Sequence, residues 1–176
     1  MLTITHFINV LINLLIMNKN YIIIALMMGI MFSGCTNQHH ELTEQRMSQI
    51  ENQILNEWEK ICVTIEKSDS EGYASFISPD FILMGSQGSV FYSKEEYIAN
   101  VRKWFATRKN TDIENGNIIV TVLSGNMALL NQESVFRVKY KDGNIQKVRH
   151  AASFVFKKGS SGWMIIHGHE SFKDVV

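Results

Sequence analysis

The chain has little proline, little cysteine and no excess of charge. Its single proline leaves long helices and strands free of the interruption that this residue causes. The 17 basic and 17 acidic residues give a formal net charge of zero, which argues against a nucleic-acid partner. A length of 176 residues with 45% hydrophobic residues is typical of one globular domain.

Acidic residues are missing altogether from residues 1–34, where Lys19 is the one lysine or arginine. The apolar run at 21–32 is 12 residues long, whereas a membrane-spanning helix needs about 20. A basic residue, a short apolar run and small residues before a cleavage site are typical of a secretory signal peptide. We therefore predict a signal peptide over 1–34.

The small residues Ser33 and Gly34 directly precede Cys35 and resemble the lipobox of bacterial lipoproteins. The resemblance implies that Cys35 carries a lipid anchor and that 35–41 form a tether. It also implies that the protein lies on the periplasmic or extracellular face of the bacterial cell envelope. The alternative is an uncleaved signal anchor with an incidental cysteine. Met17 begins a complete signal by itself, which makes it a candidate for the true start.

Helical patterns dominate the first part of the expected domain, which we place at 42–174. Apolar residues recur at spacings of three and four over 42–67, which predicts a long amphipathic helix. A short second helix is expected over 71–77. Ser93 and Glu96 form a capping box that opens a third helix.

Strand patterns and turn residues make up the rest of the domain. A small hairpin is expected over 81–92, and Asp142 with Gly143 is the strongest hairpin signal in the chain. Four longer strands are predicted at 117–123, 127–140, 145–158 and 163–172. Helices that precede a long antiparallel meander indicate the α+β fold class.

Four stretches, at 56–69, 73–88, 93–98 and 162–171, together resemble the SnoaL-like (DUF4440-type) members of the NTF2-like superfamily. The resemblance covers roughly 42–172. It implies a cone, in which a curved antiparallel sheet of about four to six strands wraps around three N-terminal helices and leaves a pocket. It also implies frequent dimers, so we expect a homodimer. It does not imply one activity, because members include isomerases, dehydratases, cyclases and binding modules.

Two turns fix the expected register of the last three strands. If Asp142 and Gly143 are the central residues of a two-residue turn, Val135 lies opposite His150. A second two-residue turn is expected at 160–161. Side chains alternate between the faces of a strand, so one face should line the pocket and the other should form the dimer surface. A bulge or a three-residue turn would exchange the faces beyond it.

The expected pocket face is apolar at one end and polar at the other. Ligand contacts are predicted there for Asn131, Arg137, His150, Phe154, Trp163 and Ser171. Arg137 or His150 would hold an anionic group. The apolar residues of the opposite, expected dimer face are Leu130, Phe136, Val138, Val155, Met164 and Ile166.

Glu133 and His169 lie on either side of Ala152 in this register, so a small residue separates a carboxylate from an imidazole. Because the pKa of histidine is about 6.5 and shifts readily, such a pair suits acid–base catalysis. The candidate catalytic residues are therefore His169, His167 and Glu133. The alternative is that both histidines only make hydrogen bonds at the rim of the sheet.

The two histidines are also possible metal ligands, because residues two apart in a strand point the same way. A stable metal site usually needs a third protein ligand, and no spacing in the chain demands one. We therefore predict neither a metal nor a cofactor.

The predicted function is that of a cell-envelope lipoprotein that binds a small polar-aromatic or anionic ligand in its cone. The expected partners are this small molecule, the membrane through Cys35, and a second copy of the chain. One alternative is a small lyase, isomerase or hydrolase that uses the histidines and Glu133 as an acid–base site. Another is a dimeric assembly module without a functional pocket.

Overall fold

The computed structural model describes residues 42–85 and 91–175. The predicted signal peptide, the tether at 35–41 and the lipidation site Cys35 lie outside the described residues. No helix in the described ranges is long and apolar enough to cross a membrane.

Three helices form where the sequence predicts them: α2 (Glu44–Glu66), α3 (Ser70–Ser75) and α4 (Lys94–Thr107). The predicted capping box opens α4, because the Ser93 hydroxyl accepts from the backbone N–H of Glu96 and the Glu96 carboxylate accepts from that of Ser93. The apolar stripe of α2 is buried, and it consists of Ile50, Ile54, Trp58, Ile61, Cys62 and Ile65.

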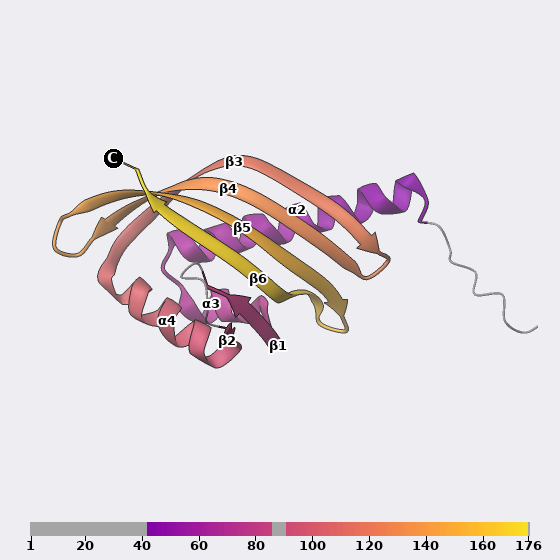
Figure 1. Cartoon of the computed structure of the whole chain (residues 1–176), viewed down its shortest axis with the longest axis horizontal. Coiled ribbons are helices and arrows are strands. Elements are labelled where there is room, and N and C mark those ends of the chain that lie inside the picture. Colours follow the sequence, from indigo (N-terminus) through magenta and orange to yellow (C-terminus); the bar gives the residue numbers. More distant parts are fainter. Residues whose placement is uncertain (1–41, 86–90, 176) are drawn as a thin grey trace, which may run out of the picture. The chain divides into compact units, whose positions relative to one another are not determined.

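Six strands form one sheet in the order β2-β1-β6-β5-β4-β3. Their bounds are β1 (Ile77–Met84), β2 (Phe91–Ser93), β3 (Arg108–Ser124), β4 (Met127–Tyr140), β5 (Ile145–Gly159) and β6 (Gly162–Asp174). Neighbouring strands are antiparallel except β1 and β6, which are parallel. Figure 1 shows the long strands arching over α2, with α3 and α4 on the same side of the sheet. The predicted α+β cone with a curved sheet is confirmed.

The register between β4 and β5 differs from the prediction by one residue. The turn at 141–143 has three residues, because the Tyr140 N–H donates to the Asn144 carbonyl at 2.9 Å. Gly143 has a φ of 92°, in the left-handed region that glycine tolerates. Ser134, and not Val135, therefore pairs with His150.

A bulge in β6 produces the second difference. The turn at 160–161 has the predicted two-residue form, and Phe156 pairs with Ile165 as expected. Val155 then pairs with His167, so Ile166 is an extra residue in β6. Beyond this bulge the two faces of β6 are exchanged.

Because of the two shifts, the side chains of β4 and of the second half of β6 lie on the opposite side of the sheet from the predicted one, relative to β5. Polar residues that face the concave side are Gln132, Ser134, His150 and Glu170, all of them buried. Glu133, Arg137, His169 and Ser171 are exposed on the convex side, with Asn131 and His167 partly buried there. The predicted dimer face is therefore wrong in part, because Leu130, Phe136 and Val138 belong to the buried interior.

Candidate functional site

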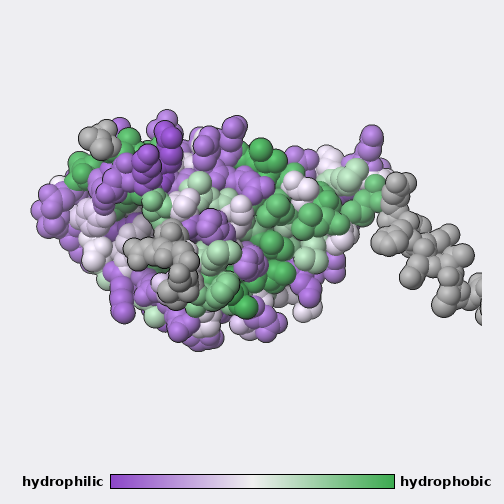
Figure 2. Space-filling model, in the orientation of Figure 1, coloured by the Kyte–Doolittle hydropathy of each residue, from purple (hydrophilic) through white to green (hydrophobic). Residues whose placement is uncertain are grey.

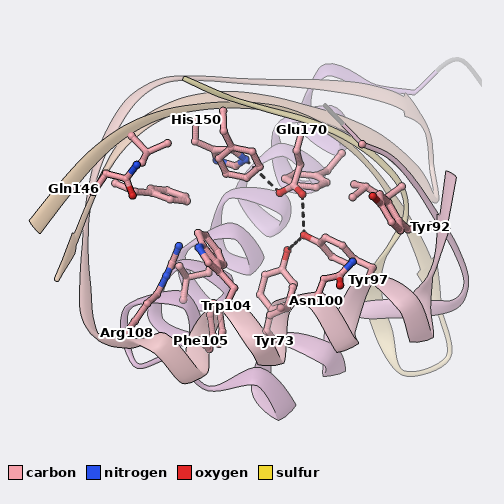
Figure 3. A pocket seen from close by; sticks show the side chains of 18 of the residues that line it. Tyr73, Tyr92, Tyr97, Asn100, Trp104, Phe105, Arg108, Gln146, His150 and Glu170 are labelled. Carbon is pink, nitrogen blue, oxygen red and sulfur yellow. Dashed lines mark hydrogen bonds and ion pairs between the residues drawn. The ribbon is translucent and has the colours of Figure 1, made fainter. Parts of the chain in front are cut away.

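A cavity of about 500 Å³ lies between the concave face of the sheet and the helices (Figure 3). Its walls are mainly aromatic, and the rings come from Trp58, Tyr73, Tyr92, Tyr97, Trp104, Phe105, Phe136, Tyr140, Phe154 and Phe172. Because protein interiors are normally packed without voids of this size, the open space is a feature of the fold that needs an explanation.

A chain of four polar side chains, Tyr73, Tyr97, Glu170 and His150, runs along one side of the cavity (Figure 3), and Gln132 extends it beyond the cavity wall. The Tyr73 and Tyr97 hydroxyl oxygens are 2.7 Å apart, and the Tyr97 hydroxyl donates to Glu170 Oε2 at 3.0 Å. Glu170 Oε1 lies 3.3 Å from His150 Nε2. On its other side, His150 Nδ1 lies 2.8 Å from Gln132 Nε2. The five side chains therefore come from five separate elements, α3, α4, β4, β5 and β6, with Glu170 in the middle of the chain.

The direction of each hydrogen bond follows from the donors present. Because the Tyr97 hydrogen points to Glu170, the Tyr73 hydroxyl must donate to Tyr97. The Gln132 amide nitrogen can only donate, so it donates to Nδ1 of His150 and leaves the ring hydrogen on Nε2. Nε2 is at ion-pair distance from Glu170, although its N–H does not point straight at the oxygen. The two tyrosine hydroxyls thus form a relay that ends at the Glu170 carboxylate, and the Nε2 side of His150 faces the same carboxylate.

Burial keeps the two tyrosines in their protonated form. It raises the pKa of Tyr97 well above its ordinary value, and the negative charge of Glu170 raises it further. The same two causes raise the pKa of Tyr73. Both hydroxyls therefore remain hydrogen-bond donors at any physiological pH; Tyr73 donates to Tyr97, and Tyr97 donates to the carboxylate of Glu170.

Aromatic rings hold His150 in place. Its ring is stacked on Phe172, with centroids 4.6 Å apart and an interplanar angle of 19°. Phe136 lies against it with a centroid distance of 4.8 Å, and Trp104 contacts both phenylalanines. Because His150 is only 2% exposed, these contacts leave it a single orientation toward Glu170.

Arg108 enters the cavity away from this polar chain (Figure 3). It is the residue at which α4 ends and β3 begins, and it is 2% exposed. The guanidinium lies against the Trp104 ring, and Nη1 donates to the Thr111 hydroxyl at 3.1 Å. Nε and Nη2 have no hydrogen-bond partner, and no ion pair among the described residues includes Arg108. Burial lowers the pKa of Arg108 to about 9, so the group is still a cation at pH 7.

Two of the predicted ligand contacts line this cavity. They are His150 and Phe154, both on the concave side of β5. Trp163 is buried on the same side, but its indole N–H donates to Gln53 Oε1 at 2.8 Å and the ring is not part of the cavity wall. The predicted position of Trp163 in the pocket is therefore wrong, because the ring packs against α2.

The other predicted site residues lie on the convex face. A shallow hollow there collects Asn131, Glu133, His169 and Ser171, while Arg137 lines a separate one. Cross-strand partners run from Asn131 through Ser153 to His169. The predicted position of Glu133 and His169 inside the cone is wrong, because of the three-residue turn and the bulge. His167 is also on this side, and the catalytic role of all three stays an untested prediction.

Four cavity residues escaped the sequence analysis. Glu170 lies between His169 and Ser171, so any face that includes these two excludes it. Tyr73 and Tyr97 occur within helical patterns, where an aromatic residue is most simply part of the core. Arg108 directly follows a helix. The one feature of the sequence that could indicate a role for it is its position where the helical pattern changes to a strand pattern. Within the described residues, no group of three or more His, Cys, Asp or Glu side chains is placed to hold a metal ion.

The sequence matches the SnoaL-like domain family over residues 52–174. Among solved structures, a conserved protein from Planctomyces limnophilus DSM 3776 is 17% identical with a TM-score of 0.62, over 73% of this chain and 99% of that one. An NTF2-like superfamily protein from Salmonella enterica is 20% identical with a TM-score of 0.61, over 70% and 91% of the two chains. A hexachlorocyclohexane dehydrochlorinase from Novosphingobium barchaimii LL02 is 12% identical with a TM-score of 0.60, over 76% and 95%.

These identities are low, so the solved structures show the shared fold and not a shared activity. None of the curated proteins is similar enough to match. The family match covers most of the chain and ends at the last residue of β6. The chain therefore belongs to the SnoaL-like domain family, whose members have the NTF2-like fold.

Proposed function

We propose that this chain binds a small organic ligand inside its cone, as a lipid-anchored protein of the bacterial cell envelope. The observation that carries the binding proposal is a cavity of about 500 Å³ that has aromatic walls and a buried carboxylate. Ligand sites are typically concave, about 300–1,000 Å³ in volume, and mostly apolar with a few convergent polar groups. The polar chain lines this cavity, so its groups are placed to recognise a ligand.

Glu170 has capacity left for a ligand. A carboxylate has about four lone-pair sites; Tyr97 occupies one of them, and His150 Nε2 lies 3.3 Å from the other oxygen. A hydroxyl or amide N–H of the ligand can therefore donate to Glu170 without displacing either protein partner. The aromatic rings around the cavity favour a ligand with a flat or apolar body.

Filling the cavity is expected to abolish binding without loss of the fold. Val148 lines the cavity from β5, so the variant Val148→Trp places an indole in the empty space. Native mass spectrometry of the protein, purified without stripping and then exposed to a panel of small aromatic compounds, should show bound compound in the wild type only. The matched control is Val135→Trp on the convex face of β4, which should bind like the wild type. A wild-type chain that retains no compound would contradict the proposal.

Lipidation of Cys35 is tested by labelling with palmitate. Wild-type protein expressed in bacteria should incorporate the label, and Cys35→Ser should lose it and leave the membrane fraction. Cys62→Ser is the matched control, because the Cys62 thiol is buried in α2 and burial raises its pKa to about 12. Equal labelling of wild type and Cys35→Ser would refute the anchor.

A second copy of the chain is the proposed occupant of the convex face. Large apolar side chains are exposed there on β3 and β1, with Ile119 at 58%, Leu123 at 52% and Ile82 at 47% exposure. Figure 2 shows hydrophobic surface gathered in a band across the sheet. Such a patch on a soluble chain favours association.

The variant Ile119→Asp is expected to convert the dimer to a monomer, because an aspartate that is buried in the contact between two copies loses its hydration. Light scattering coupled to gel filtration measures the mass. Val63→Asp, on the exposed side of α2, is the control and should leave the dimer intact. If the wild-type chain is a monomer at micromolar concentration, the proposal of a dimer fails.

Acid–base catalysis on the bound molecule is a second candidate function, and the buried contact between His150 and Glu170 favours it. Nδ1 of His150 accepts from Gln132 and Nε2 carries the ring hydrogen, so neither nitrogen is free to take a proton from a ligand. Glu170 is therefore the candidate base, with Tyr97 as the nearest donor. Turnover of small hydroxy and keto acids separates this function from binding alone.

A further inference from the structure

We infer that Arg108 is a carboxylate-recognition residue and that the ligand is a small, largely apolar monocarboxylate whose acid group binds this guanidinium. The inference rests on the proposed ligand-binding function and names the chemical class of the ligand. It is carried by two buried, unpartnered nitrogen atoms on the wall of the cavity.

The free nitrogens of Arg108 are the pair that a carboxylate needs. Nη1 is already used, since it donates to the Thr111 hydroxyl at 3.1 Å. Nε and Nη2 remain, and their N–H bonds leave the same edge of the guanidinium in parallel. This edge matches the two oxygens of a carboxylate in a bidentate contact. The bond to Thr111 therefore orients the guanidinium and leaves its recognition edge available.

The protein itself offers no counter-charge to this cation. Three other polar residues of the cavity wall are satisfied by one another, because the Tyr140 hydroxyl donates to Gln146 Oε1 at 2.7 Å and Gln146 Nε2 donates to Asp174 at 2.8 Å. Asp174 also lines the cavity, but it forms no ion pair with Arg108. A buried cation without an anion is unfavourable, and the lowered pKa of Arg108 has the same cause. An anionic ligand would remove this penalty.

The rest of the cavity limits the ligand to one negative charge. Glu170 lines the same space, so a second acid group on the ligand would be repelled from that side. Trp58 also lines the cavity, and its indole N–H is buried without a partner. The body of the ligand would contact Trp104, Phe136 and Phe172, where the Trp104 ring lies against both phenylalanine rings. A monocarboxylate with an aromatic body and a hydroxyl group satisfies all of these contacts.

Matched acids and amides test the inference on the full-length chain. The probes are phenylacetate, cinnamate and their hydroxylated forms, each paired with its neutral amide and titrated by calorimetry at pH 7. At least one acid should bind the wild type roughly tenfold or more tightly than its amide, as expected for a charge-assisted bidentate contact. Arg108→Gln should remove this preference, and Arg108→Lys should keep part of it. The matched control is Arg102→Gln, an exposed arginine of α4, which should bind like the wild type.

Thermal denaturation provides a second measurement, which shows whether a variant that binds weakly is still folded. Without ligand, Arg108→Gln should be at least as stable as the wild type, because it removes an unpaired buried charge. The acids should raise the melting temperature of the wild type and not that of Arg108→Gln. Equal binding of acids and amides, or a preference that survives in Arg108→Gln, overturns the inference and leaves ligand binding intact. If neither acids nor amides bind the wild type, the inference and the proposed binding function fail together.

Discussion

Replacing Glu170 by alanine is expected to lower the free energy of unfolding by about 3 kcal/mol. Glu170 is 7% exposed, accepts from the Tyr97 hydroxyl and lies 3.3 Å from His150 Nε2. Its removal leaves the Tyr97 hydroxyl without an acceptor inside the protein and takes away the carboxylate that faces His150. Each orphaned donor costs roughly 1–3 kcal/mol. Urea denaturation of the full-length chain at pH 7 measures the change.

The neighbouring residue provides the control. Ser171→Ala should change stability by less than about 0.5 kcal/mol, because Ser171 is exposed on the convex face. A loss below about 1 kcal/mol in Glu170→Ala would contradict a fully engaged carboxylate. Such a small loss would mean that His150 and Tyr97 form hydrogen bonds with water or with each other in the variant.

Glu170→Gln separates the structural role of this residue from a chemical one. A glutamine oxygen can still accept from Tyr97, so the loss of stability should be about 1 kcal/mol. If Glu170 is a base, turnover should nevertheless fall by roughly 10²–10⁴-fold, because an amide cannot take the proton. Turnover that persists in Glu170→Gln would exclude Glu170 as the base and leave the binding function.

Helices and strands could be predicted because their periodicity is a local property of the sequence. The stripe of α2 and the capping box of Ser93 and Glu96 both depend on residues within one or two turns. The pairing of β1 with β6 joins segments about 85 residues apart, as in the pair of Ile82 and His167, and no local pattern indicates it. That parallel pair is interrupted between Ile77 and Ile82, where the only proline of the chain, Pro79, cannot donate to a neighbouring strand.

The sequence does not predict the candidate site because the register shifts by one residue at each of two places, the turn at 141–143 and the bulge in β6. The pair of Asp142 and Gly143 suits a two-residue turn and a three-residue turn equally well, because both need glycine in the left-handed region. The bulge at Ile166 interrupts an apolar run in which no polar alternation exists to show a shift. His150 and Phe154 were placed correctly because β5 is the strand from which both registers were counted. The side chains of β4, and those of β6 after Ile166, lie on the side of the sheet opposite to the predicted one.

Substitution of Gly168 by valine is the second change for which a large effect is expected. Gly168 faces the interior directly after the bulge, opposite Phe154 of β5. A Cβ atom at this position would lie 2.9 Å from the Phe154 ring and 3.0 Å from a Leu83 methyl group. Both neighbours are buried, at 1% and 4% exposure, so neither can move away without disturbing the core. We expect a loss of about 3 kcal/mol, at the upper end for an overpacked core.

The same substitution should also weaken ligand binding, because Phe154 and Leu83 line the cavity and would be pushed into it. Thermal denaturation and titration with the aromatic acids measure the two effects on one preparation. Gly159→Val at the end of β5 is the control, since a Cβ there meets no atom within 4 Å. If Gly168→Val were as stable as Gly159→Val, the bulge would not hold Gly168 against Phe154. The face assignment of Glu170, two residues further along β6, would then be wrong as well.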